Sequence, residues 1–239
     1  MIEAGLWGLA AASTLVIGAL AGLYLPIPRR FVALAMAFGA GALISALSFD
    51  LTEDAFNSSN AAVVAPGLAL GALTFYFGNR LINEARRGKR VEPVATSNGL
   101  ALVLGALLDG IPESVVLGST LLSGAAISVP FLVAVAISNF PEGLSAASDL
   151  KREGRSPGWI MGLWIGVAVA SGVAAALGYY LLGDVGPNWV PLIQSFAAGA
   201  ILTMLVDTMI PEAYEGGGSL TGLVTVAGFA MAFFLTSVE

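Results

Sequence analysis

The chain has 239 residues, of which 57% are hydrophobic and only 11% charged, and its formal net charge is -6. It contains no cysteine and no histidine, which excludes a disulfide framework, a thiolate metal site, and imidazole as a metal ligand or proton carrier. Any ion chemistry must therefore use carboxylate, amide, hydroxyl, thioether or backbone oxygen. Several apolar stretches approach the roughly 20 residues that a membrane-spanning helix needs, and they predict an integral membrane protein embedded in the lipid bilayer.

The apolar stretches predict an all-α polytopic protein with eight transmembrane helices. Only short polar or glycine- and proline-rich stretches separate them, and none could link two folded domains, so we expect one domain over residues 1–239. The expected spans are Leu6 to Leu25, Phe31 to Phe56, Ala61 to Ile82, Gly99 to Leu122, Val129 to Leu150, Gly158 to Leu182, Trp189 to Tyr214 and Leu220 to Val238.

The basic residues predict the orientation. All ten Lys and Arg residues fall in or beside the first, third and fifth loops between the expected spans. Odd-numbered loops share one face, and the positive-inside rule places that face in the cytoplasm. We therefore expect a multi-pass protein of the cell (inner) membrane with both termini outside.

An internal repeat connects the two ends of the chain. A shift of 158 positions places Phe38 to Ser45 over Phe196 to Thr203, and without a gap it places Asp54 over Glu212. Residues 1–83 and 158–239 are thus expected to be two copies around a central helix pair at 99–150, inverted relative to each other because five spans separate their starts. Inverted repeats are typical of secondary transporters, whose site lies near the midplane; chance similarity between apolar segments is the alternative.

A proline-glutamate motif occurs in three apolar segments, Ile111-Pro112-Glu113, Phe140-Pro141-Glu142 and Ile210-Pro211-Glu212. A charge inside a membrane is costly, and a helix-breaking proline leaves a backbone carbonyl without its donor. On a helix, residues i and i+4 share a face, which pairs Asp109 with Glu113 and Ser138 with Glu142. Two carboxylates brought together in low dielectric either share protons or bind a divalent cation. The motif therefore predicts a metal site.

These two central segments resemble the paired metal-binding helices of the ZIP family of divalent-metal transporters, in its prokaryotic, GufA-like branch. The family pattern is His-Asn-x-Pro-Glu-Gly, followed one span later by Gln-Asn-x-Pro-Glu-Gly. Residues 139–143 match the second copy closely, whereas the first copy has Asp109 for histidine, Gly110 for asparagine and Ser114 for the last glycine. The resemblance implies the three-two-three arrangement, a homodimer, and metal ligands at Asp109, Glu113, Ser138, Asn139 and Glu142.

The departures from the family pattern bear on the metal. Family members commonly hold two metals, but Gly110 replaces one ligand and the span from Gly158 to Leu182 contains no acid. Oxygen ligands suit Mn, Mg and Ca, whereas imidazole suits Zn. The identity of the substrate metal (Zn, Mn, Fe or Cd) is not determined. Zinc is the first or second candidate because it is a usual substrate of the family.

Two further acidic groups are candidate metal ligands, Asp50 with Asp54 near the end of the second span and Asp207 with Glu212 near the end of the seventh. We expect both groups on the outer side, as an entrance that concentrates cations. The alternative is that they are solvated helix ends.

We interpret the chain as a divalent metal cation transporter that moves metal toward the cytoplasm. It is not expected to be an enzyme or to bind nucleic acid. Two alternatives remain, a proton-coupled carrier or channel for another solute that uses the same acids as a proton relay, and a non-transporting membrane scaffold.

Overall fold

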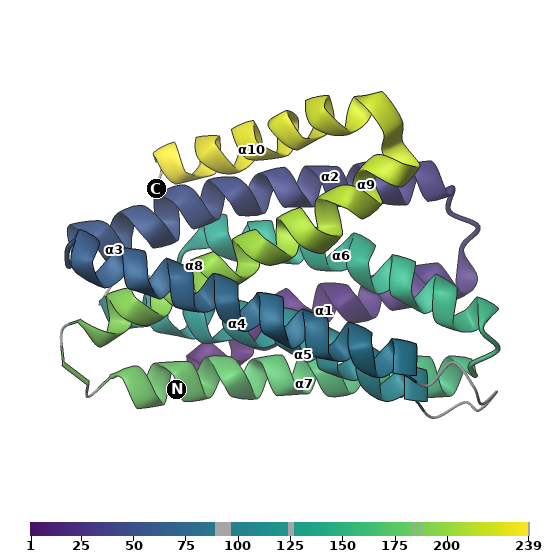
Figure 1. Cartoon of the computed structure of the whole chain (residues 1–239), viewed down its shortest axis with the longest axis horizontal. Coiled ribbons are helices and arrows are strands. Elements are labelled where there is room, and N and C mark those ends of the chain that lie inside the picture. Colours follow the sequence, from purple (N-terminus) through teal and green to yellow (C-terminus); the bar gives the residue numbers. More distant parts are fainter. Residues whose placement is uncertain (89–96, 124–126, 184, 187, 239) are drawn as a thin grey trace.

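In the computed structural model the described residues form helices joined by short turns, with no strand among them (Figure 1). These are residues 1–88, 97–123, 127–183, 185–186 and 188–238, and within them the side chains at 82–83, 85–88, 97–106, 108–109 and 123 lie outside the description. The first half contains α1 (Ile2–Tyr24), α2 (Arg29–Ala46), the π-helix η1 (Leu47–Glu53), α3 (Asp54–Asn57), α4 (Ala61–Gly88), α5 (Ser97–Thr120) and the 3-10 turn η2 (Leu121–Ser123). The second half contains α6 (Val129–Arg152), α7 (Pro157–Leu182), α8 (Trp189–Met204), the π-helix η3 (Leu205–Met209), α9 (Ile210–Gly217), the 3-10 turn η4 (Gly218–Leu220) and α10 (Thr221–Val238).

The helices pack in two groups. In the first group α1 lies against α6 and α7, and α5 lies against α7. In the second group α2 packs on α10 and α4 packs on α8. The two groups meet mainly where α2 crosses α6 and α5 meets α8, and a continuous apolar core that includes Leu43, Phe131 and Ile201 joins them.

Glycines set the close approaches within each group. A Cβ atom built on Gly41 of α2 would lie 1.8 Å from the carbonyl oxygen of Thr225 in α10, and one on Gly71 of α4 would lie 1.8 Å from that of Phe196 in α8. Small residues allow membrane helices to pack backbone against backbone, where lipid gives no hydrophobic drive to associate. The glycines therefore fix which helices are neighbours.

The loops at one end of the bundle carry the basic residues. The turn between α1 and α2, the turn between α6 and α7 and the end of α9 lie together at this end, whereas both termini and α3 lie at the other (Figure 1). Lys151 donates a hydrogen bond to the carbonyl of Leu23, which links the ends of α6 and α1. Gly154, with φ of +86°, makes the turn into α7, where a residue with a side chain would be strained. Lys89 and Arg90, in the third loop, lie outside the described residues.

The expected helices are found at the expected positions. By length and hydropathy, six segments of the described chain could each cross a membrane: Ile2–Tyr24, Arg29–Asn57, Ala61–Leu81, Val129–Arg152, Pro157–Leu182 and Trp189–Val238. The last one contains α8 to α10 and turns back at η4 (Figure 1), and α5 is not among the six. The chain is therefore a multi-pass helical membrane protein, while eight spans stay a prediction.

The prolines of the three proline-glutamate motifs have different helical surroundings. Helices α5 and α6 run through Pro112 and Pro141 without a break. Only near Pro211 does the regular helix give way, where the π-helix η3 separates α8 from α9. The expected spans also run through these two prolines, because removing one intrahelical hydrogen bond does not stop a helix whose neighbours hold it in place.

Candidate metal site

A small pocket lies between α1, α5, α6 and α7, at the level of the two proline-glutamate motifs of α5 and α6. Its polar lining consists of Glu113, Ser114, Asn139 and Ser171, and the rest is apolar or glycine. Its interior holds about one water-sized particle. The pocket thus joins one residue of each central motif to side chains from two other helices.

Glu113 is the charged residue of this pocket. Its side chain is 3% exposed, and it sits one residue after Pro112 in the middle of α5. Pro112 has no N–H group, so the carbonyl of Leu108 receives no helical hydrogen bond from it. Next to Glu113, the Ser114 hydroxyl donates to the carbonyl of Gly110 over 2.7 Å. This part of α5 therefore supplies both a carboxylate and backbone oxygen.

Asn139 brings the second motif into the pocket. Its side chain is buried, and its amide nitrogen donates to the carbonyl of Ala11 in α1 over 3.4 Å. With the nitrogen bound to α1, the amide oxygen is the atom that can accept a hydrogen bond or bind a cation. The helix register thus presents Asn139 toward Glu113.

Of the other expected ligands, Ser138 and Glu142 lie outside the pocket lining, and the position of the Asp109 side chain is not described. Ser138 is buried on the side of α6 that packs against α2, where a Cβ on Gly39 would come within 2.8 Å of its Cα, and its hydroxyl donates to Val135. Glu142, one turn after Asn139, is half-buried and is not part of the pocket lining. Asp109 occupies α5 one turn before Glu113, but its side chain lies outside the described residues.

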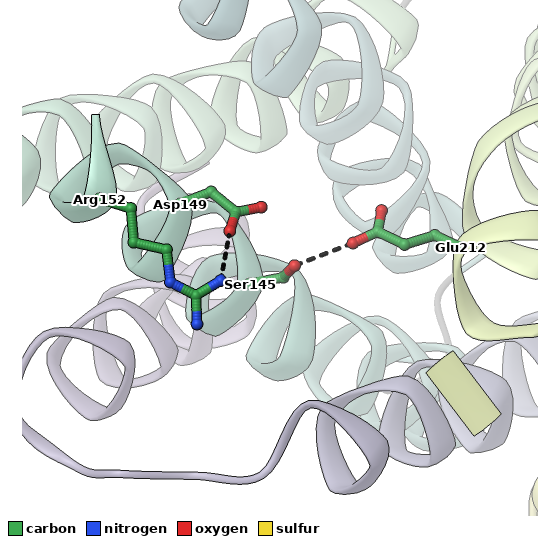
Figure 2. Close-up of polar contacts among 4 residues, drawn as sticks. All are labelled: Ser145, Asp149, Arg152 and Glu212. Carbon is green, nitrogen blue, oxygen red and sulfur yellow. Dashed lines mark hydrogen bonds and ion pairs between the residues drawn. The ribbon is translucent and has the colours of Figure 1, made fainter. Parts of the chain in front are cut away.

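A polar contact joins α6 to α9 one turn beyond Glu142. The hydroxyl of Ser145 donates to Oε1 of Glu212 over 2.8 Å, and farther along α6 Asp149 pairs with Arg152 at 3.4 Å (Figure 2). Glu212 of α9, a helix that packs on α2, therefore contacts the central helix α6.

The two outer acidic groups do not share an end of the molecule, and the expectation that they would was wrong. Asp50 and Asp54 follow the C-terminal end of α2. Glu212 instead belongs to α9, which packs at the N-terminal end of α2. A Cβ atom built on Gly216 of α9 would lie 3.7 Å from the carbonyl oxygen of Arg29. Because α2 runs the length of the bundle, Asp50 and Asp54 lie near one of its ends and Glu212 lies toward the other.

The acidic residues also differ in burial. Asp50 is 8% exposed within η1, whereas Asp54, Asp207 and Glu212 are exposed. Within the described part of the chain, no three acidic side chains converge in a way that could hold a metal. A site built here must therefore combine carboxylate with amide, hydroxyl and backbone oxygen.

Sequence reasoning missed Ser171 and Ser114 as members of the pocket. A lone serine in an apolar helix gives no pattern, and the only signal was that Ser171 lies in the span without acids. Ser145 was also missed as a partner of Glu212, although it follows Glu142 by one helical turn. The set of buried oxygen atoms, a carboxylate, an amide and two hydroxyls, is of the kind that binds hard and borderline divalent cations.

Two relatives are similar to the chain over most of its length. It is 32% identical to the zinc transporter ZIPB of Bordetella bronchiseptica, over 96% of this chain and 79% of that protein. It is 25% identical to a putative zinc transporter of Arabidopsis thaliana, over 88% of this chain, which spans about a third (34%) of that protein's length. No family model matches the chain. The relatives are metal transporters and not enzymes, and the chain belongs to the ZIP family.

Proposed function

We propose that this protein transports a divalent metal cation, zinc first among the candidates, through the pocket between α1, α5, α6 and α7. The observation that carries the proposal is the burial of Glu113, from the first proline-glutamate motif, beside Asn139, which directly precedes the second, in a pocket within the membrane-spanning bundle. A buried carboxylate in such a place marks an ion pathway in most membrane proteins. Zinc accepts carboxylate oxygen, and both relatives are named as zinc transporters.

The packing supports an inverted repeat of three, two and three spans. The π-helices η1 and η3 begin at Leu47 and Leu205, which are 158 positions apart, the same shift that aligns the two halves. The contacts repeat as well. The carbonyl of Phe38 meets Gly228, and that of Phe196, its counterpart, meets Gly71.

The last span of each copy deviates by one residue. Gly71 and Gly228 are 157 positions apart, so the third and eighth spans align best with a shift one shorter than the rest. A single inserted residue accounts for this between the second and third spans of the first copy. The repeat units are proposed as residues 1–83 and 158–239, around the central pair α5 and α6.

We place the basic end of the bundle in the cytoplasm and both termini outside, following the positive-inside rule. Metal then enters past Asp50 and Asp54 and leaves toward Glu212, on the cytoplasmic side. Glu142 lies along α6 between Asn139 and Ser145, where it can take a cation from the pocket to this exit. The proposed direction of transport is inward.

The test is zinc uptake into liposomes that contain the purified protein. Glu113→Gln keeps the side-chain volume but removes the charge, so zinc binding should weaken by about 1.5–3 kcal/mol, or at least tenfold, and uptake should fall with it. Glu153→Gln, at an exposed position after α6, is the matched control and should transport normally. Each assay includes an arm with excess Mg²⁺, which should not reduce uptake. Full uptake by a correctly folded Glu113→Gln variant refutes the proposal.

A further inference from the structure

We propose that the turn between α6 and α7 binds the phosphate of an anionic phospholipid of the cytoplasmic leaflet, through Arg155 and the indole ring of Trp159. The guanidinium carbon of Arg155 lies 4.9 Å from the centre of the Trp159 ring, in a cation–π contact. Trp159 is 38% exposed and is the third residue of α7, at the basic end of the bundle (Figure 1). Exposed tryptophans at helix ends lie at the level of the lipid headgroups. The inference goes beyond metal transport and needs only the orientation given above.

The backbone of the turn holds this pair in place. Gly154 supplies the positive φ, and the N–H group of Arg155 donates to the carbonyl of Leu150 over 3.0 Å, which closes a Schellman motif at the end of α6. The Ser156 hydroxyl then accepts a hydrogen bond from the backbone N–H of Trp159 over 3.3 Å and caps the start of α7. Both members of the pair thus belong to capped helix ends, so little backbone freedom is lost when a ligand binds.

Arg155 has no carboxylate partner among the described residues. Of the other basic residues of the turn, Arg152 pairs with Asp149, and Lys151 donates to a carbonyl at the end of α1. Glu153, the exposed acid of the turn, forms no ion pair within the described chain. A guanidinium held in position without a counter-charge matches a phosphate, which it can bind through two parallel hydrogen bonds. Anionic lipids of the cytoplasmic leaflet supply that phosphate together with a negative surface potential.

The face of α7 that runs from Arg155 into the membrane suits an acyl chain. A Cβ atom on Gly158, Gly162 or Gly166 would meet no described atom within 4 Å, and their spacing of four residues places all three on one exposed face. Packing within the described chain does not require glycine there, although each glycine costs helix stability relative to alanine. A hydrocarbon chain can lie along this face and continue from a headgroup at Arg155, whereas a free phosphate ion would gain nothing from it.

The experiment measures quenching of tryptophan fluorescence by brominated lipids, with the purified full-length protein in phosphatidylcholine nanodiscs. Bromine quenches the indole rings that it touches, so the difference between wild type and Trp159→Phe reports the lipid beside Trp159. Brominated phosphatidylglycerol should half-quench this signal at about fivefold lower mole fraction than brominated phosphatidylcholine, the effect of roughly one basic residue at an anionic surface. The signal of Trp189, which is exposed at the other end of the bundle, should be quenched equally by both lipids. Equal quenching of the Trp159 signal by the two lipids overturns the inference.

Two variants separate a site at Arg155 from the general charge of the surface. Arg155→Gln should remove the preference for phosphatidylglycerol. Arg30→Gln, which removes the same charge from an exposed position at the same end, should retain it. An equal loss in both variants overturns the site, because it means that the whole basic surface attracts the lipid. Inorganic phosphate should leave the quenching unchanged, and recovery of the Trp159 signal on its addition overturns the assignment to lipid.

A last set of variants tests the glycine face of α7. Gly162→Leu should raise the amount of phosphatidylglycerol needed to quench Trp159, whereas Gly222→Leu, at an equally open position of α10, should not. The other possible occupant of this face is a helix of a second copy of the chain. Because the chain has no cysteine, Gly162→Cys provides a single thiol there, and it should stay monomeric under oxidation. Efficient disulfide-linked dimers at this position overturn the assignment to lipid.

Discussion

The contact between α1 and α6 beside the pocket gives the sharpest stability prediction. A Cβ atom on Gly18 of α1 would lie 2.1 Å from the carbonyl oxygen of Phe140, directly before Pro141. On the other helix, a Cβ on Gly143 would lie 2.3 Å from the carbonyl oxygen of Leu15. Gly18→Ala therefore places a methyl group against backbone, which cannot rotate away as a side chain can.

The magnitude follows from the geometry. Restoring ordinary contact requires α1 and α6 to separate by roughly 1 Å, which weakens the dispersion contacts along the whole crossing. Overpacking of this kind costs about 1–3 kcal/mol. The same separation stretches the bond from Asn139 to Ala11, already 3.4 Å long, so zinc binding should fall together with stability.

The assay is thermal unfolding in detergent together with zinc titration, with Gly166→Ala as the control. No atom of the described residues lies within 4 Å of a Cβ on Gly166 of α7, and alanine there improves helix propensity by up to about 1 kcal/mol. Gly18→Ala should melt below wild type and Gly166→Ala at or above it. If Gly18→Ala has the melting temperature and the zinc affinity of the wild type, the close backbone contact between α1 and α6 is wrong.

Two more predictions concern the preference for zinc over manganese and the orientation of the bundle in the membrane. Asp109→His restores a soft ligand where the family has imidazole, so preference for zinc over manganese should rise about tenfold, or roughly 1.4 kcal/mol; competition between the two metals at fixed pH measures it, and an unchanged ratio means that Asp109 does not contact the metal. Single cysteines at Ser59 and Ser219 should differ in labelling by an impermeant maleimide in intact cells, with Ser59 reactive and Ser219 protected like Ser156. Labelling at Ser156 and Ser219 but not at Ser59 would reverse the orientation.

The positions of the helices could be predicted from the sequence because membrane-spanning helices follow from composition and length. Their boundaries agree closely, for example Pro157–Leu182 against an expected start at Gly158. What could not be predicted was how a helix responds to proline. The same Pro-Glu pair sits inside regular helix at Pro112 and Pro141 but beside a π-helix at Pro211, since neighbouring helices, and not local propensity, decide the outcome.

The site was predicted in part. Glu113 and Glu142 were expected to meet, with Asn139 as a further ligand; Glu113 and Asn139 share one pocket, whereas Glu142 is not part of its lining. Ser138 was chosen because it lies four residues before Glu142, yet the rotation of α6 turns it toward α2. Helical spacing tells which residues share a face but not which helix that face meets. Ser171 could not be found at all, because only packing brings α7 beside Glu113.

The size of the pocket sets a condition on what can enter it. With space for about one water-sized particle, the site has no place for a hydration shell, and an incoming ion must give up nearly all of its water. Mg²⁺ gives up its waters reluctantly and usually keeps several of them in protein sites. It is therefore a poor competitor here despite its preference for oxygen, and the free energy of dehydration acts as a filter that no single ligand provides.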